Sequence, residues 1–196
     1  MDLAKTILNK AEEYSNYTAT NLSKLIKIKS LSGEEEGVAI ALKQMMEEAG
    51  FDEVKIDGLG NVIGRIGNGK KIIAIDGHID TVDLGNLDAW EFDPLGGEIK
   101  NGFVLGRGAA DQTGGPAAAI TAGKILKEIG AWMKINGEAI YGTSKWTTLK
   151  EGPTSLEMKS TTDREKLGFR TKFTTEDFWF TAKGKNIYVI SVVPPA

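Results

Sequence analysis

The chain has 196 residues, of which 41% are hydrophobic and 26% are charged, with a net charge of -3. It has no cysteine, which excludes disulfides, thiolate metal sites and cysteine nucleophiles, and the acidic balance argues against nucleic acid as a partner. No apolar run approaches the roughly 20 residues that span a bilayer, and the N-terminus lacks the pattern of a signal peptide, so we expect no membrane partner and a cytoplasmic location.

Two helices are predicted at the start of the chain. Apolar residues recur at helical spacing over residues 2–28, although residues 15–18 are weak helix formers and favour a bend. The second helix is predicted to begin with a capping box formed by Ser32 and Glu35 and to end at Gly50. Its buried stripe is expected to comprise Val38, Ala41, Leu42, Met45 and Met46.

Strands and a further helix are predicted between residues 54 and 130. Residues 54–56 and 61–66 alternate as strands do, and residues 71–76 form a continuous apolar run typical of a strand buried on both faces. Residues 98–105 predict a hairpin with an Asn101-Gly102 turn, and residues 116–129 predict a helix that stops at Gly130. This order of elements indicates an α/β fold.

The composition changes after residue 130, where glycine becomes rarer and aromatic residues more frequent. Residues 153–168 are predicted as loop, and residues 178–181 and 187–193 as the strands of a β-hairpin. We therefore divide the chain into a domain of residues 1–130 and a segment of residues 131–196.

His78 is the single histidine and follows the predicted strand 71–76 directly. Asp80 lies two residues on, so both side chains point the same way from an extended strand, and Asp111 stands before a helix after a glycine-rich turn. An imidazole and carboxylates at strand ends suit a metal such as zinc, with one group able to fix the tautomer of the imidazole. Alternatively, His78 is a strand-end histidine with satisfied hydrogen bonds and Asp111 is a helix cap.

Residues 77–82, 90–94 and 106–115 resemble the zinc-dependent family that includes acetylornithine deacetylase, succinyl-diaminopimelate desuccinylase and aminoacylase. Residues 28–35 resemble its N-terminal helix junction, so the resemblance covers residues 1 to about 130. It implies a partial mixed sheet flanked by helices, one or two zinc or similar divalent ions, and hydrolysis of an amide bond in N-acyl amino acids or small peptides. It further implies that His78 binds one metal, that Asp80 orients His78, and that Asp111 bridges two metals.

The sequence departs from that family in the motifs that follow Asp111. The family next supplies an adjacent pair of glutamates, a further acidic ligand and a second histidine, none of which is recognisable here. The acidic pair Glu176-Asp177 stands in an unrelated context, and Glu138 and Glu151 stand alone. The general base is thus unidentified, and we predict that hydrolysis is absent or very poor.

Residues from about 126 to 196 resemble the C-terminal part of α-L-fucosidases, which predicts an antiparallel β-hairpin region. Glu138 and Trp146 are candidates for binding a sugar, although a turn position and core packing are the simpler interpretations of these two residues. The two resemblances meet at residues 126–130, which leads to the hypothesis of a chimeric sequence. A non-catalytic chain that covers its open sheet edges by self-association is a third interpretation.

Overall fold

The computed structural model describes residues 11–155, 173–191 and 193. The chain divides into two compact units, of which one spans Tyr14–Ile129 and the other takes the remaining residues. Residues 2–10 of the first predicted helix, most of the predicted loop 153–168 and residue 192 of the last hairpin lie outside the described residues. None of the described helices has the length and apolar character needed to cross a membrane.

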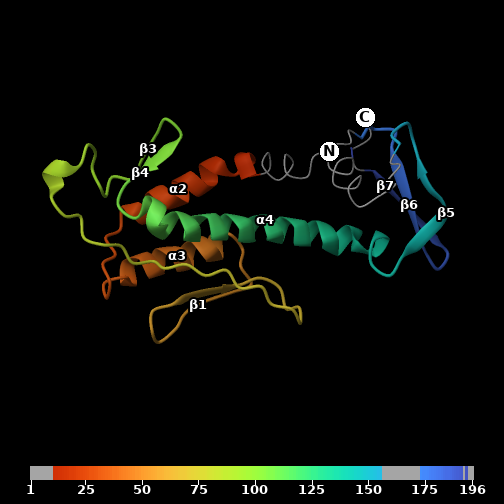
Figure 1. The fold of residues 1–196 in the computed structure, drawn as a ribbon. Coiled ribbons are helices and arrows are strands. Elements are labelled where there is room, and N and C mark those ends of the chain that lie inside the picture. Colours follow the sequence, from red (N-terminus) through yellow and green to blue (C-terminus); the bar gives the residue numbers. More distant parts are fainter. Residues whose placement is uncertain (1–10, 156–172, 192, 194–196) are drawn as a thin grey trace, which may run out of the picture. The chain divides into compact units, whose positions relative to one another are not determined.

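Three helices build the core of the unit Tyr14–Ile129. They are α2 (Ser15–Ile26), α3 (Glu36–Glu48) and the first part of α4 (Gly114–Asn136), which lie side by side in Figure 1. A turn at Tyr14 separates α2 from the helical residues 11–13. The buried apolar cluster comprises Leu25, Val38, Leu42, Met45, Ala49, Ala117 and Ile120.

The start of α3 differs from the prediction. Glu35, with no hydrogen bond from its side chain to the helix, precedes the first helical residue, so the capping box of Ser32 and Glu35 is wrong. Ser32 instead donates a hydrogen bond to Asp80 Oδ2 at 2.6 Å, and Glu35 accepts one from the Gly33 amide. The Ser32 hydroxyl thus donates a charge-assisted hydrogen bond to a carboxylate, and it does not accept one from a helix amide as a cap would.

Two antiparallel hairpins belong to this unit. Strands β1 (Glu53–Ile56) and β2 (Val62–Arg65) pair with each other and contact α3. Strands β3 (Glu98–Lys100) and β4 (Phe103–Leu105) pair around Asn101 and Gly102, whose positive φ angles of 52° and 81° suit a tight hairpin turn. The predicted Asn-Gly turn is therefore confirmed.

The predicted buried strand at residues 71–76 is wrong. These residues form no strand, and the side chains of Ile72 and Ile73 are 88% and 91% exposed. Strands buried on both faces need a neighbour on each side and a layer above and below, and the described residues offer this segment neither. Its apolar composition is real, but nothing described covers it.

Helix α4 continues past the predicted stop at Gly130 and ends at Asn136. A glycine inside a helix costs about 1 kcal/mol relative to alanine, and Gly130 is followed by helix-compatible residues up to Ile135. Without a proline or a left-handed residue at that position, the glycine alone does not end the helix.

The remaining unit contains a three-stranded antiparallel sheet in the order β5-β6-β7. Strands β6 (Phe178–Lys183) and β7 (Asn186–Ser191) form the predicted hairpin, whereas β5 (Ser144–Glu151) was not predicted. The short helical turn η3 (Gly137–Ala139) is tied to this sheet because Thr181 Oγ1 donates to the Ala139 carbonyl at 2.7 Å. Helices and antiparallel sheets together confirm the predicted fold class.

A buried carboxylate fastens the ends of β5 and β6. Asp177 is fully buried and accepts hydrogen bonds from the amides of Thr154 and Thr174 at 2.9 and 2.7 Å, with Lys150 Nζ at 3.3 Å. Burial raises the pKa of the Asp177 carboxyl, but hydrogen bonds from Thr154 and Thr174 outweigh it and hold the pKa well below the usual range. Asp177 is therefore committed to holding two loops, and Glu176-Asp177 does not act as an adjacent acidic pair.

Candidate functional site

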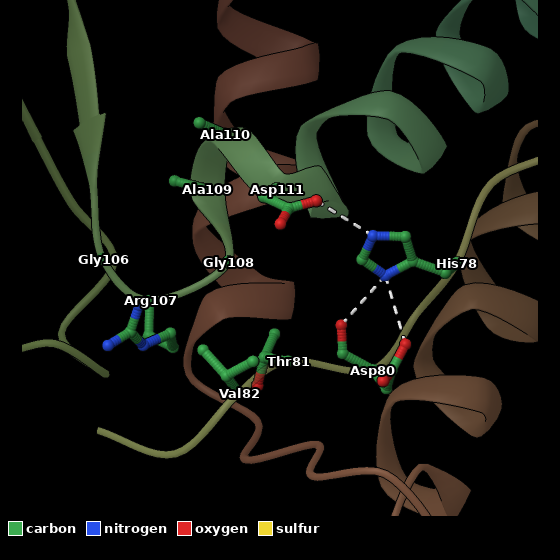
Figure 2. A pocket seen from close by; sticks show the side chains of 10 residues that line it. All are labelled: His78, Asp80, Thr81, Val82, Gly106, Arg107, Gly108, Ala109, Ala110 and Asp111. Atoms are coloured by element: carbon green, nitrogen blue, oxygen red, sulfur yellow. Dashed lines mark hydrogen bonds and ion pairs between the residues drawn. The ribbon is translucent and has the colours of Figure 1, made fainter. Parts of the chain in front are cut away.

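A pocket of about 250 Å³ lies where residues 78–82 approach residues 106–111, within the unit Tyr14–Ile129. The first segment has no regular secondary structure apart from an isolated bridge at Thr81, and the second runs from the end of β4 into the short helical turn η2 (Ala109–Thr113) that precedes α4. Figure 2 shows the residues that line this pocket: His78, Asp80, Thr81, Val82, Gly106, Arg107, Gly108, Ala109, Ala110 and Asp111.

The three side chains expected at a metal site, His78, Asp80 and Asp111, meet at this pocket. His78 Nε2 lies 3.0 Å from Asp111 Oδ1, and His78 Nδ1 lies 3.1 Å from both the main-chain oxygen and Oδ1 of Asp80 (Figure 2). Both ring nitrogens thus face acceptors, an arrangement that suits the doubly protonated imidazolium. The hydrogen bond to Asp111 is the main cause of the raised pKa of His78, with smaller contributions from Asp80.

Asp80 is itself held in place by Ser32, which sequence reasoning assigned to a helix cap. The hydrogen bond from Ser32 is the main cause that lowers the pKa of the Asp80 carboxyl. An isolated parallel bridge between Leu31 and Thr81, with the Thr81 amide donating to the Ser30 carbonyl at 2.7 Å, brings Ser32 to this position. The likeness of residues 28–35 to the zinc-dependent family was a sequence signal that could have placed Ser32 near the site, but the prediction for Ser32 did not use it in this way.

Glycines allow the second segment to approach the first. Gly108 has a φ of 77°, and a Cβ at this position would lie 2.5 Å from Thr81 Cγ2 and 3.0 Å from Thr113 Oγ1. Gly106 is equally enclosed, because its Cβ would lie 2.3 Å from Ile26 Cγ2. Any larger residue would push the turn, and Asp111 with it, away from His78.

Arg107 and Trp90 form a second contact that the sequence did not predict. The Arg107 guanidinium lies 4.8 Å from the centre of the Trp90 ring, and the Trp90 indole donates to the Leu84 carbonyl at 2.8 Å. A cation over an aromatic face is stabilised by the ring quadrupole. The pair fixes the loop after residue 82 against the turn that carries Asp111.

The donors at the pocket do not complete a metal centre by themselves. Among the described residues, no three histidine, cysteine, aspartate or glutamate side chains form a group able to hold a metal ion. His78 and Asp111 are of the right chemical type for zinc. His78 must lose a proton before it can bind a metal, so metal and proton compete for the same nitrogen.

The two other predicted site residues, Glu138 and Trp146, lie in the second unit. Glu138 is exposed in η3, and its carboxylate is the main cause of the raised pKa of the Tyr188 hydroxyl. Trp146 lies in β5 with 38% of its surface exposed. Sugar binding by these residues stays a prediction.

Comparisons with known proteins support a hydrolase of the peptidase and amidohydrolase type over the residues that match. Residues 74–140 match the family described as peptidase family M20/M25/M40. The match includes every residue that lines the pocket but not Ser32, which holds Asp80, and it ends beyond the predicted boundary at residue 130.

Individual relatives are similar over part of their length. The uncharacterized protein YgeY of Escherichia coli (strain K12) is 44% identical over 126 residues, which is 64% of this chain and 31% of YgeY. A succinyl-diaminopimelate desuccinylase of Cereibacter sphaeroides (strain ATCC 17025 / ATH 2.4.3) is 38% identical over 102 residues, or 50% of this chain and 27% of that protein. A probable succinyl-diaminopimelate desuccinylase of Staphylococcus epidermidis (strain ATCC 12228 / FDA PCI 1200) is 35% identical over 113 residues, or 56% of this chain and 28% of that protein.

The chain therefore spans about a third of the length of the curated relatives it matches. These similarities support the zinc-dependent peptidase resemblance of the N-terminal part. They give no support to a fucosidase origin of residues 126–196, which remains a prediction, as does the chimeric junction.

Proposed function

We propose that the chain carries a metal-dependent hydrolase-like domain of the amidohydrolase and peptidase type, directed at the amide bond of N-acyl amino acids or small peptides. One observation carries the proposal. His78 and Asp111, 33 residues apart in sequence, meet at 3.0 Å in a pocket, while Asp80 holds the other ring nitrogen of His78.

The donor set fits a weakly held divalent ion such as zinc. His78 and Asp111 would be the protein ligands, and Asp80 would fix the imidazole with Nε2 turned toward the ion. When bound, such an ion polarises a carbonyl and lowers the pKa of water. Catalytic zinc sites use three protein ligands, so two donors support weak binding.

Protonation sets the conditions under which His78 can act as a ligand. With both ring nitrogens facing acceptors, the imidazolium is favoured and the pKa of His78 is raised. Metal binding must release this proton. We expect affinity for zinc to increase as the pH rises through the pKa of His78.

We further propose that the catalytic site of this chain is incomplete. A general base must lie within hydrogen-bond reach of the proton that it removes, and among the described residues no glutamate lines the pocket. The sequence has one histidine, so no second imidazole is available. We expect amide hydrolysis at or near the background rate.

Zinc titration by isothermal calorimetry tests the site directly. The unaltered protein is expected to bind zinc, and His78→Ala and Asp111→Asn are expected to lose that binding. Asp88→Asn is the matched control because Asp88 is an exposed carboxylate in the short turn η1 (Leu87–Ala89), outside the pocket lining. Equal affinity in Asp111→Asn and Asp88→Asn would show that the pocket holds no metal.

A carbohydrate-related function of the C-terminal part is the second candidate. The partly exposed Trp146 favours it, because tryptophan faces stack on sugars and this side chain is accessible. Fucose titration with tryptophan fluorescence, compared between the unaltered protein and Trp146→Phe, is the test. An unchanged spectrum across the titration would count against this function.

A further inference from the structure

Ser32 acts on the candidate metal site through Asp80, although Ser32 does not line the pocket. Its hydroxyl donates a hydrogen bond to Asp80 Oδ2 at 2.6 Å, while Asp80 Oδ1 lies 3.1 Å from His78 Nδ1. Figure 2 shows Asp80 turned toward the ring of His78. Each oxygen of the Asp80 carboxylate thus has its own partner, and the contact with Ser32 leaves Oδ1 for the imidazole.

A tight turn holds the Ser32 side chain in this place. The Glu34 amide donates to the Leu31 carbonyl at 2.7 Å, which closes a turn with Ser32 and Gly33 at its centre. Gly33 has a φ of 87°, and a type II turn requires such a positive φ at its third residue. The position of the hydroxyl is therefore determined by the backbone of the turn.

The two segments that carry Ser32 and Asp80 are joined by hydrogen bonds next to this contact. The carbonyl of the buried Ser30 accepts hydrogen bonds from the Thr81 amide at 2.7 Å and from the Thr81 hydroxyl at 3.3 Å. Thr81 directly follows Asp80, and Ser30 lies two residues before Ser32. The hydroxyl and the carboxylate are thereby kept within hydrogen-bond distance of each other.

The two ring nitrogens of His78 face competing carboxylates. A neutral imidazole has one proton, and the nitrogen without it is the one that can bind a metal. Nδ1 faces two acceptors at 3.1 Å, the main-chain oxygen and Oδ1 of Asp80, whereas Nε2 faces Asp111 Oδ1 at 3.0 Å. The Asp111 side chain is 93% exposed, so water competes for its oxygens, whereas the Asp80 side chain is 39% exposed and held by Ser32. The geometry favours the proton on Nδ1.

We propose that Ser32 is a positioning residue for His78. By occupying Asp80 Oδ2, Ser32 keeps Oδ1 on His78 Nδ1 and so leaves the unprotonated Nε2 for a divalent ion. The effect on metal binding rests on the function proposed above, whereas the preference for a proton on Nδ1 exists without a metal.

Nitrogen chemical shifts of the His78 ring test the positioning role in the metal-free protein. His78 is the single histidine, so one set of ring signals is expected, and at a pH where the ring is neutral the shifts report which nitrogen holds the proton. We expect mainly Nδ1–H in the unaltered protein, a shift toward Nε2–H in Ser32→Ala, and recovery in Ser32→Thr, which keeps the hydroxyl. An unchanged proton distribution in Ser32→Ala would overturn the proposal.

Glu35→Ala is the matched control for damage to the turn. This variant removes the hydrogen bond from the Gly33 amide to Glu35 Oε1, within three residues of Ser32, and leaves the Ser32 hydroxyl intact. Its His78 ring should resemble that of the unaltered protein. A shift as large as that of Ser32→Ala would mean that the turn as a whole is responsible, and would contradict a specific role of the hydroxyl.

A double-mutant cycle with Asp80 tests whether Ser32 acts through that carboxylate. If it does, adding Ser32→Ala to Asp80→Ala should leave the proton distribution of His78 as it is in Asp80→Ala alone. A further shift equal to that caused by Ser32→Ala in the unaltered background would show another route and refute the proposed one.

Zinc titration by calorimetry separates this inference from the proposed function. Ser32→Ala should bind zinc about tenfold more weakly, at the low end of the effect of residues that orient metal ligands, and Ser32→Thr should bind as the unaltered protein does. Equal zinc affinity in Ser32→Ala and the unaltered protein would contradict the role of Ser32 in metal binding. Failure of the unaltered protein to bind zinc, together with the expected shift of the His78 proton in Ser32→Ala, would refute the proposed function and support the positioning role.

Discussion

Gly108→Ala is expected to destabilise the protein through two separable effects. A non-glycine residue in the left-handed region, here at a φ of 77°, costs about 1–2 kcal/mol. The added Cβ also meets Thr81 Cγ2 at 2.5 Å, and forcing a methyl group into packed surroundings costs about 1–3 kcal/mol. Thr81 is anchored to Ser30 by its amide, so it cannot move away freely. The free energy of unfolding should fall by about 2–5 kcal/mol.

Gly60→Ala isolates the first effect. Gly60 has a similar φ of 87°, but no atom lies within 4 Å of its added Cβ. Its loss should be about 1–2 kcal/mol. Urea unfolding of both variants gives the difference, and ¹H NMR of the histidine ring should reveal a changed pKa of His78 in Gly108→Ala alone. Equal loss of stability in the two variants, with an unchanged histidine, would refute the close contact between Gly108 and Thr81.

Three further results are expected. The pKa of His78 should exceed 6.5 in an NMR titration and should fall in Asp111→Asn. Because folding raises this pKa, the protonated His78 ring contributes fully to the stability of the fold below pH 6.5, and this contribution disappears as the pH rises through the folded pKa. Leu42→Ala should lower the free energy of unfolding in urea by about 2–5 kcal/mol, whereas Leu59→Ala should change it little because Leu42 is 2% and Leu59 90% exposed. Asp177→Asn should be less stable than the unaltered protein, and this difference, measured by denaturant unfolding at several pH values, should shrink as the pH falls below 3.8, since the pKa of Asp177 is lowered by folding.

The sequence predicted correctly those elements whose conformation depends only on residues close to one another in the chain. The Asn101-Gly102 turn and the apolar stripe of α3 needed no knowledge of the rest of the chain, because turn geometry and helical spacing determine them. The assignment of Ser32 failed because its acceptor, Asp80, is 48 residues away in sequence. The meeting of His78 and Asp111 was expected from family resemblance, not from spacing, since no periodic pattern relates positions 33 residues apart.

The segment 71–76 explains why the fold could be predicted only in part. Apolar composition reports what a segment gains by burial, but not whether neighbours exist to cover it. The matched relatives are about three times longer than the part that this chain matches. The same isoleucines that predicted a central strand are exposed beside unpaired backbone groups. Because the apolar surface and the free backbone groups occur in the same residues, only neighbouring strands could bury this segment, and the described residues supply none.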